Sequence, residues 1–271
     1  MANSSVVFVG IAPHPPIMVP EVGGEMIAEV RGSIDAMREL TERVIACGAE
    51  TVVTISPHAP LEARAFVAYD GPEVYGDFAN FRAPQATVGA PVDEELLAAI
   101  KEHAALGGYA VNALKGRALD HGTAVPLYFL LRNGWDGRVV SLGYCFLSDE
   151  DHVRFGECVR RACDAVGRRV AFIASGDLSH RLKPDAPAGY NPEAHLFDEE
   201  VVEAISACAP NNIAKIDPAL RRLAGECGYR SMLTALGVSE GEGCEVLHYE
   251  APFGVGYLVA QISRPPGPQS L

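Results

Sequence analysis

The amino-acid sequence predicts an α/β fold with a mixed, largely parallel central sheet. Apolar runs of strand length alternate with helical patterns from Val6 to Ile262, and this alternation is typical of a sheet covered by helices. Near the end of the chain, Glu245–Glu250 and 256–261 flank a turn that contains Pro252 and Gly254, which is the pattern of a β-hairpin. The final hairpin makes the predicted sheet mixed.

The chain is long enough for one large domain. It has 271 residues, 48% of them hydrophobic, and no long linker interrupts the alternation of strands and helices. We therefore predict a single domain over 1–262. The remaining segment, 263–271, is Pro-rich and is predicted to be a flexible tail.

The predicted strands are short and rich in β-branched residues. Four runs read as buried strands: Val6–Ala12, Thr51–Ser56, Arg138–Gly143 and Val170–Ser175. The segment 64–69 alternates polar and apolar residues, which predicts a strand with one solvent-exposed face. The region 70–91 carries Gly, Pro, Asn and several aromatic residues. We interpret it as a long loop, which in a compact domain usually has a function.

Helical patterns fill most of the chain between these strands. The predicted helices are 25–47, 92–106, 124–132, Asp149–Val166, 192–207, 218–227 and 228–236. Gly48 is a plausible stop for the first of them. Asp93, Glu94 and Glu95 fall in the first turn of the second, where negative charge is favourable.

Composition argues against several classes of function. The net charge is −13 and no basic patch stands out, which argues against nucleic acid and acidic membrane surfaces as partners. The apolar runs are too short for a transmembrane helix, and the first residues do not resemble a secretory signal. The seven cysteines are scattered, with no C-x-x-C pair. We therefore expect reduced thiols and a cytoplasmic protein.

Two histidines occur in nearly the same local sequence. His14 follows the first apolar run within Pro-His-Pro-Pro, and His58 follows the second within Pro-His-Ala-Pro. Flanking prolines restrict the backbone, so each imidazole leaves its strand in a defined direction. His180 also follows an apolar run, Val170–Ser175, through the segment Gly-Asp-Leu-Ser-His. Because ligands bind beyond the carboxyl ends of strands in such sheets, these positions predict a functional site.

The other histidines divide into two groups. His103, His152 and His195 fall in predicted helices, and we interpret them as surface or capping residues. His121 lies in an Asp-His-Gly turn and joins the candidate site. His248 alternates with Glu250, so both point to one face of the hairpin; Glu250 is the better candidate ligand because it ends its strand.

Two histidines and one carboxylate can form the facial triad of a non-heme Fe(II) centre, which leaves open positions for a substrate and O₂. The same ligand set also serves hydrolytic zinc enzymes, and ligand type alone does not separate the two metals. His121 and His180 would remain for proton transfer, since imidazoles titrate near neutral pH.

Five short segments together resemble a known family. They are APHPP (12–16), SPH (56–58), DHG (120–122), SGDLSH (175–180) and YEAPFGVGY (249–257). As a set, they resemble the class III extradiol dioxygenase superfamily, typified by the catalytic subunit of protocatechuate 4,5-dioxygenase. The last segment is also similar to the Memo-associated, dioxygenase-like branch.

The resemblance implies a three-layer α/β/α domain with Fe(II) bound by His14, His58 and Glu250. It implies that His180 is the acid–base residue and that His121 assists proton transfer; Asp177 either orients His180 or caps its loop. The implied reaction is cleavage of a catecholic or aminophenolic ring by O₂, beside rather than between its hydroxyl groups.

The implied reaction partners are a small aromatic substrate and O₂. Members of the superfamily often form homo-oligomers, some with a small second subunit. The alternative is a Memo-like metal-binding protein with a redox or partner-binding role and no ring cleavage.

Overall fold

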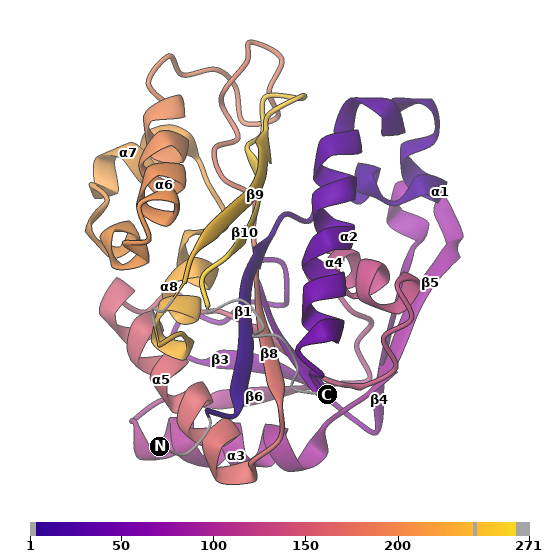
Figure 1. Cartoon of the computed structure of the whole chain (residues 1–271), viewed down its shortest axis with the longest axis vertical. Helices are drawn as coiled ribbons and strands as arrows, with labels where there is room; N and C mark the ends of the chain where they lie inside the picture. The colour runs from indigo at the N-terminus through magenta and orange to yellow at the C-terminus, as the bar shows by residue number, and fades with distance from the viewer. Residues whose placement is uncertain (1–3, 241–242, 264–271) are drawn as a thin grey trace.

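An eight-stranded mixed sheet forms the centre of the computed structural model, which describes residues 4–240 and 243–263 (Figure 1). The strand order is β6-β3-β7-β2-β8-β1-β10-β9. The strands are β1 (Val6–Ala12), β2 (Thr51–Ser56), β3 (Phe66–Asp70), β6 (Val111–Lys115), β7 (Arg138–Gly143), β8 (Val170–Ser175), β9 (Glu245–Glu250) and β10 (Tyr257–Gln261).

The four central strands, β7, β2, β8 and β1, are parallel to one another. Every residue of β2 and β8 is buried, as expected for strands covered on both faces. β10 is antiparallel to β1 and β9 is antiparallel to β10, so the hairpin makes the sheet mixed as predicted. On the other side of the sheet, β3 is antiparallel to β7 and parallel to β6, which the sequence did not predict. The four runs predicted as buried strands have the predicted bounds.

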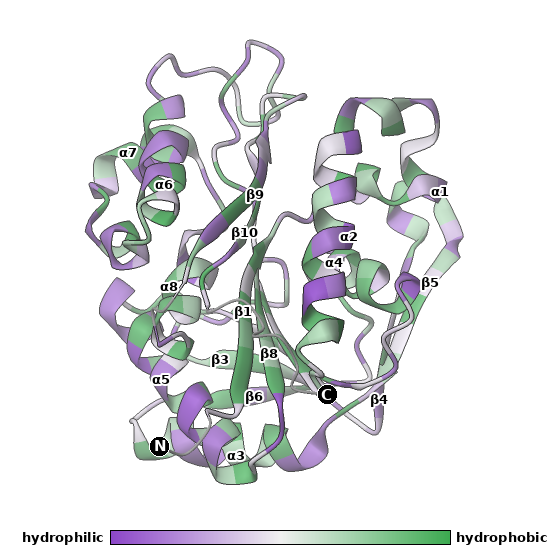
Figure 2. Ribbon diagram, in the orientation of Figure 1, coloured by the Kyte–Doolittle hydropathy of each residue, from purple (hydrophilic) through white to green (hydrophobic). Residues whose placement is uncertain are grey.

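Helices cover both faces of the sheet, and the predicted α/β/α layering is confirmed (Figure 1). The helices α2 (Arg31–Ala46) and α4 (His121–Arg132) lie on one side, and α3 (Glu94–Leu106), α5 (Asp149–Val166) and α8 (Tyr229–Val238) lie on the other. Figure 2 shows the hydrophobic strands between helices with hydrophilic outer faces. The shorter or peripheral helical elements are α1 (Pro20–Gly23), α6 (His195–Ser206), α7 (Pro218–Ala224), η1 (Pro16–Met18), η2 (Gly24–Val30), η3 (Ala79–Phe81) and η4 (Pro210–Lys215).

The region 70–91, expected to be a loop, is mostly a β-hairpin. β4 (Glu73–Phe78) pairs with β5 (Ala83–Pro91) in a separate two-stranded sheet, and the residues of β4 alternate between exposed and buried. The glycines and prolines of this region masked its strand pattern. The hairpin packs on α4, whose first residue is His121.

Three further expectations are wrong. The strand expected over 64–69 to have one solvent-exposed face is β3, in which every residue except Asp70 is buried. The helical pattern 25–47 is two elements, the 3-10 helix η2 followed by α2. His152 is fully buried rather than a surface residue: its Nδ1 is 2.8 Å from the carbonyl oxygen of Ser148 and its Nε2 is 3.2 Å from that of Cys145.

The predicted tail lies outside the described residues, apart from Ser263. Across the described parts of the chain, no helix is both long and apolar enough to cross a membrane. The seven cysteines are free thiols, as expected.

Candidate metal centre and active site

The carboxyl ends of β1, β8 and β2 meet at one edge of the sheet, because these strands are adjacent and parallel. His14 lies two residues after β1, and His58 two residues after β2. β8 separates these strands, so the two histidine loops come from strands that are not neighbours. The loop that contains His180 follows β8 between them, and β9, which runs in the direction of β1, brings Glu250 to the same edge.

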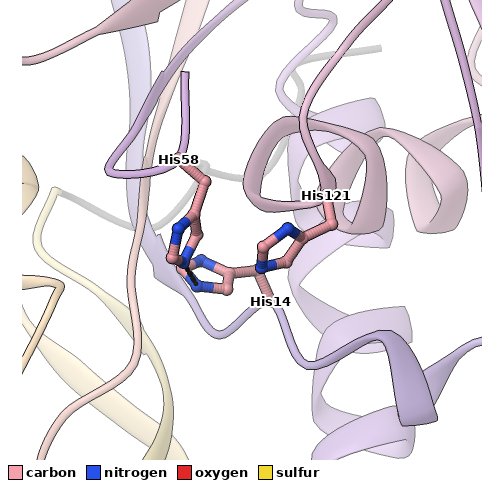
Figure 3. Close-up of side chains that lie close together, drawn as sticks. All are labelled: His14, His58 and His121. Carbon is pink, nitrogen blue, oxygen red and sulfur yellow. Dashed lines mark hydrogen bonds between the residues drawn. The ribbon is translucent and has the colours of Figure 1, made fainter. Parts of the chain in front are cut away.

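Three histidine rings gather at this edge (Figure 3). The Nε2 atoms of His14 and His58 are 3.0 Å apart. The ring of His121 stacks on that of His58, with 4.2 Å between centroids, and lies 5.4 Å from that of His14. One possible ligand nitrogen from each ring lies within 4.8 Å of the others, so residues distant in the sequence form one site.

Hydrogen bonding fixes the tautomer of His14. The hydroxyl of Ser175 donates its single hydrogen to the carbonyl oxygen of Gly122, 2.5 Å away. Its oxygen must therefore accept from Nδ1 of His14, which is 2.9 Å away. Nδ1 carries the hydrogen, and the lone pair of His14 is on Nε2, which faces His58. This is how a metal-binding imidazole is normally oriented by its surroundings.

A second set of hydrogen bonds positions the other two rings. Asp120 is the N-cap of α4 and accepts from the backbone N–H of Thr123, which places His121 in the first turn of the helix. Asp120 also accepts from the hydroxyl of Ser56 at 2.5 Å. The oxygen of that hydroxyl in turn accepts from the backbone N–H of His58. One carboxylate therefore supports the loops of both His58 and His121.

The clustered imidazoles are neutral at neutral pH. Burial, followed by repulsion from the neighbouring rings, holds the pKa of His14 well below its usual value. Desolvation also lowers the pKa of His58, although its outer side is exposed, and it lowers that of His121 against the opposing effect of Asp120. Neutral imidazole is the form that binds a metal ion.

The geometry of the pair His14 and His58 fits a shared cation. Two imidazole nitrogens bound at about 2.1 Å and at right angles around one ion would lie about 3.0 Å apart, and the two Nε2 atoms are 3.0 Å apart. Since the lone pair of His14 points at the other nitrogen, the contact requires either a proton or a metal ion between them.

A family model described as "Catalytic LigB subunit of aromatic ring-opening dioxygenase" matches residues 9–260. The chain belongs to this family. The match includes each of the predicted site residues, His14, His58, His121, His180 and Glu250.

The chain is also similar to individual known proteins. Protein CA_C1420 of Clostridium acetobutylicum is 34% identical over 93% of this chain, which spans 56% of that protein's length. A 3,4-dihydroxyphenylacetate 2,3-dioxygenase of Escherichia coli is 24% identical over 70% of this chain and 72% of its own length. The solved structure of the uncharacterised Escherichia coli K12 protein JW3007 has the same fold, with a TM-score of 0.62 at 17% identity, covering 94% of this chain and 99% of that one.

Glu250, the carboxylate ligand implied by the resemblance to class III extradiol dioxygenases, bonds to residues outside the histidine cluster. Its Oε1 accepts from both the backbone N–H and the hydroxyl of Ser33, at 2.9 and 2.5 Å, where the first turn of α2 offers unpaired N–H groups. Its Oε2 is 3.4 Å from Nε2 of His248. Among the described residues, Glu250 belongs to neither group of potential ligands that lie within 4.8 Å of one another. Its role as a metal ligand stays a prediction.

His180 lies half-buried near the cluster. Its charge would interact with those of His14 and His58, and burial lowers its pKa. Asp177, expected either to orient His180 or to cap its loop, instead accepts from the backbone N–H of His14 at 3.0 Å. Its carboxylate also lies 3.8 Å from Nε2 of His14.

Two residues beside the histidine cluster were not predicted. The thiol of Cys227 is 3.7 Å from Nε2 of His14 and, with Asp177, forms a second group able to hold a metal ion. No local pattern marks this cysteine, which is 213 positions from His14. The ring of Phe81, at the tip of the hairpin, lies 5.4 Å from that of His121. The aromatic residues of region 70–91 were the signal for such a contact.

Replacing Ser175 with alanine is expected to weaken metal binding by about 10–100-fold, because His14 loses the acceptor that fixes its tautomer. Titration with a chelating competitor measures the affinity. Ser141→Ala is the matched control: Ser141 is a buried strand serine whose hydroxyl has no hydrogen-bond partner among the described residues. Equal affinities in the two variants would contradict the role of Ser175.

Proposed function

We propose that this chain is a non-heme Fe(II)-dependent extradiol dioxygenase that cleaves a catecholic or aminophenolic ring with O₂. The observation that most supports this is the pair of neutral imidazoles at the sheet edge, with Nε2 atoms 3.0 Å apart and two further histidines beside them. Membership of the LigB family supports ring opening as the class of reaction.

In this proposal, His14, His58 and Glu250 hold the metal. Bound Fe(II) would supply open coordination positions and the redox chemistry that ring opening by O₂ requires. His14 offers a nitrogen whose tautomer is already set by Ser175, so little reorganisation accompanies binding. His58 is an exposed residue, so a small aromatic molecule can reach the site from solvent.

The remaining histidines handle protons. His180 donates its Nδ1 hydrogen to the carbonyl oxygen of Leu178, so its Nε2 has a free lone pair and can take a proton from a substrate hydroxyl. His121 is neutral and stacked on His58, where it can receive or return a proton during product formation. A positioned acid or base typically contributes about 10²–10⁴-fold in rate.

The expected homo-oligomer, the second subunit and the cytoplasmic location remain predictions. Free cysteines throughout the chain support a reducing compartment.

Phe81 is proposed to form an aromatic wall of the substrate site. Phe81→Ala is expected to raise KM for a catechol by roughly tenfold, the loss of about 1–1.5 kcal/mol of ring contact, while metal content stays unchanged. Steady-state oxygen uptake measures KM. Tyr75→Ala is the control on the same hairpin, since Tyr75 is 60% exposed in β4. An unchanged KM in Phe81→Ala would remove Phe81 from the site.

The roles of Glu250 and His121 can be distinguished by measuring how much iron each variant binds. Glu250→Ala is expected to lose bound iron, whereas His121→Ala keeps the iron and loses turnover. Elemental analysis of anaerobically reconstituted protein measures the iron. Glu245→Ala, at the other end of β9 and paired with Arg43, should behave as the unchanged protein. Iron retained in Glu250→Ala but lost in His121→Ala would transfer the role of third ligand to His121.

The proposed function is tested by loading the protein with Fe(II) without oxygen and then adding air and a panel of catechols and aminophenols. Ring fission consumes one O₂ per substrate and gives a yellow product when a catechol is opened beside its hydroxyls. If fully iron-loaded protein consumes no O₂ with any member of the panel, the proposal fails.

A second candidate is a Memo-like metal-binding protein with a redox or partner-binding role and no ring cleavage. One observation favours it: the thiol of Cys227 lies 3.7 Å from Nε2 of His14, and thiolates are ligands for redox-active soft metals. Three results together would support this candidate over the first: the protein binds copper more tightly than iron, it opens no ring, and Cys227→Ser loses the copper.

A further inference from the structure

A single peptide group joins His180 to a buried carboxylate. Nδ1 of His180 donates to the carbonyl oxygen of Leu178, 2.9 Å away. The N–H of the same peptide group belongs to Ser179 and donates to Oδ1 of Asp198, also 2.9 Å away. In a trans peptide the C=O and N–H lie in one plane and point in opposite directions. Carboxylate, peptide group and imidazole therefore form one continuous chain of hydrogen bonds.

We propose that Asp198 is a positioning residue that acts on His180 through this peptide group and holds the ring in the tautomer whose Nε2 is free to take a proton. The inference rests on the proposed function for the acid–base role of His180, and it deepens that function by adding a residue that touches neither metal nor substrate. Hydrogen bonds in such a chain polarise and strengthen one another.

The surroundings of Asp198 favour its hydrogen bond with Ser179. The residue is 1% exposed, and its Oδ2 accepts from the hydroxyl of Tyr249 at 2.7 Å. A side chain at Gly256 would place its Cβ 2.0 Å from Oδ2, so the glycine leaves the space that the carboxylate occupies. Burial raises the pKa of Asp198 to about 7, against the effect of its two hydrogen bonds.

The turn of the β9–β10 hairpin holds the two peptide groups that flank this one. Gly256 accepts from the N–H of Leu178 and donates to the carbonyl oxygen of Ser179, both at 2.8 Å. These backbone bonds fix the position of the loop, but they leave the Ser179 N–H to Asp198. Asp198 is therefore the side chain that sets the plane of the peptide group facing His180.

Asp93 provides a matched control for a purely structural role. It is also a fully buried aspartate that accepts from a backbone N–H and a hydroxyl, those of Leu96 and Thr51. Its carboxylate pairs in addition with Arg168. Thr51 begins β2, so Asp93 lies at the end of the sheet away from the histidines. Asp93→Ala should lower the free energy of unfolding and leave the tautomer of His180 unchanged.

The first test reads the tautomer of His180 directly, without turnover. The full chain is labelled with ¹⁵N-histidine, and the His180 signals are assigned by comparison with His180→Gln. Unchanged protein and Asp93→Ala are expected to show one tautomer, with the hydrogen on Nδ1. Asp198→Ala should show a mixture, and Asp198→Asn should restore the single form, because its side-chain oxygen still accepts from Ser179.

The second test is kinetic. In iron-loaded protein, Asp198→Ala is expected to lower kcat by about 10–100-fold, with KM and iron content little changed, and Asp198→Asn should recover most of the loss. If Asp198→Ala does not fold, Gly256→Ala replaces it, since the added Cβ displaces the carboxylate without changing Asp198.

Three results would overturn the inference: a single Nδ1–H tautomer in both Asp198→Ala and Gly256→Ala, the same tautomer mixture in Asp93→Ala, or an Asn variant as impaired as the Ala variant. Failure of the proposed function is distinguishable. In that case no catechol is consumed, while the tautomer still depends on Asp198.

Discussion

Replacing His58 or His14 with alanine is expected to lower the affinity for Fe(II) by more than about a hundredfold. Loss of a residue that only supports a ligand already costs about 10–100-fold, and each of these variants removes a ligand itself. The Nε2 atoms of the two rings are 3.0 Å apart, so one ion cannot keep its position when either is lost. Equilibrium titration with Fe(II) under anaerobic conditions measures the affinity.

His103→Ala is the control for this prediction, since His103 lies in α3, outside the histidine cluster. Thermal unfolding of the metal-free variants separates loss of a ligand from loss of the fold, which matters for the buried His14. An undiminished affinity in folded His58→Ala and His14→Ala would mean that the ion binds elsewhere.

Replacing His180 with glutamine is expected to leave iron binding intact and to lower kcat by about 10²–10⁴-fold, the usual contribution of a positioned acid or base. The ring donates from Nδ1 to the carbonyl oxygen of Leu178, so the variant loses the free Nε2. Oxygen uptake at saturating catechol measures kcat, and His103→Gln, in α3 and outside the histidine cluster, is the control.

The pH dependence gives a second measure of the role of His180. A base must be neutral to take a proton, and burial lowers the pKa of His180. Activity of the unchanged protein should therefore persist through neutral pH and fall only as the pH drops below that lowered pKa. The residual activity of His180→Gln should not show this fall at low pH, the acid limb of the pH profile. Full activity with the same acid limb would assign the proton transfer to another residue.

The central strands could be predicted from sequence because they are buried on both faces. The runs TVVTIS in β2 and VAFIAS in β8 consist of buried residues throughout, so no polar alternation obscures them. β6 was not predicted, since it is an edge strand with exposed residues such as Asn112 and Lys115. The β4–β5 hairpin lies outside the main sheet, and its glycines and prolines suggested a loop.

The sequence predicted only those parts of the site that a local sequence pattern marks. The prolines beside His14 and His58 mark those loops, and the two Nε2 atoms do meet. Neither the approach of Cys227 to His14 nor the bond from Ser179 to Asp198 leaves a local pattern, because each depends on segments brought together by the fold. His152 was misread since a helical position says little about burial.

The central claim is that one metal ion is held by residues from several strand ends. Diffraction data collected at the iron absorption edge, from crystals of protein loaded anaerobically with Fe(II), test it most directly. The account predicts a single strong anomalous peak within bonding distance of Nε2 of both His14 and His58. A peak bonded to neither nitrogen, or no peak in crystals shown to contain iron, would contradict it.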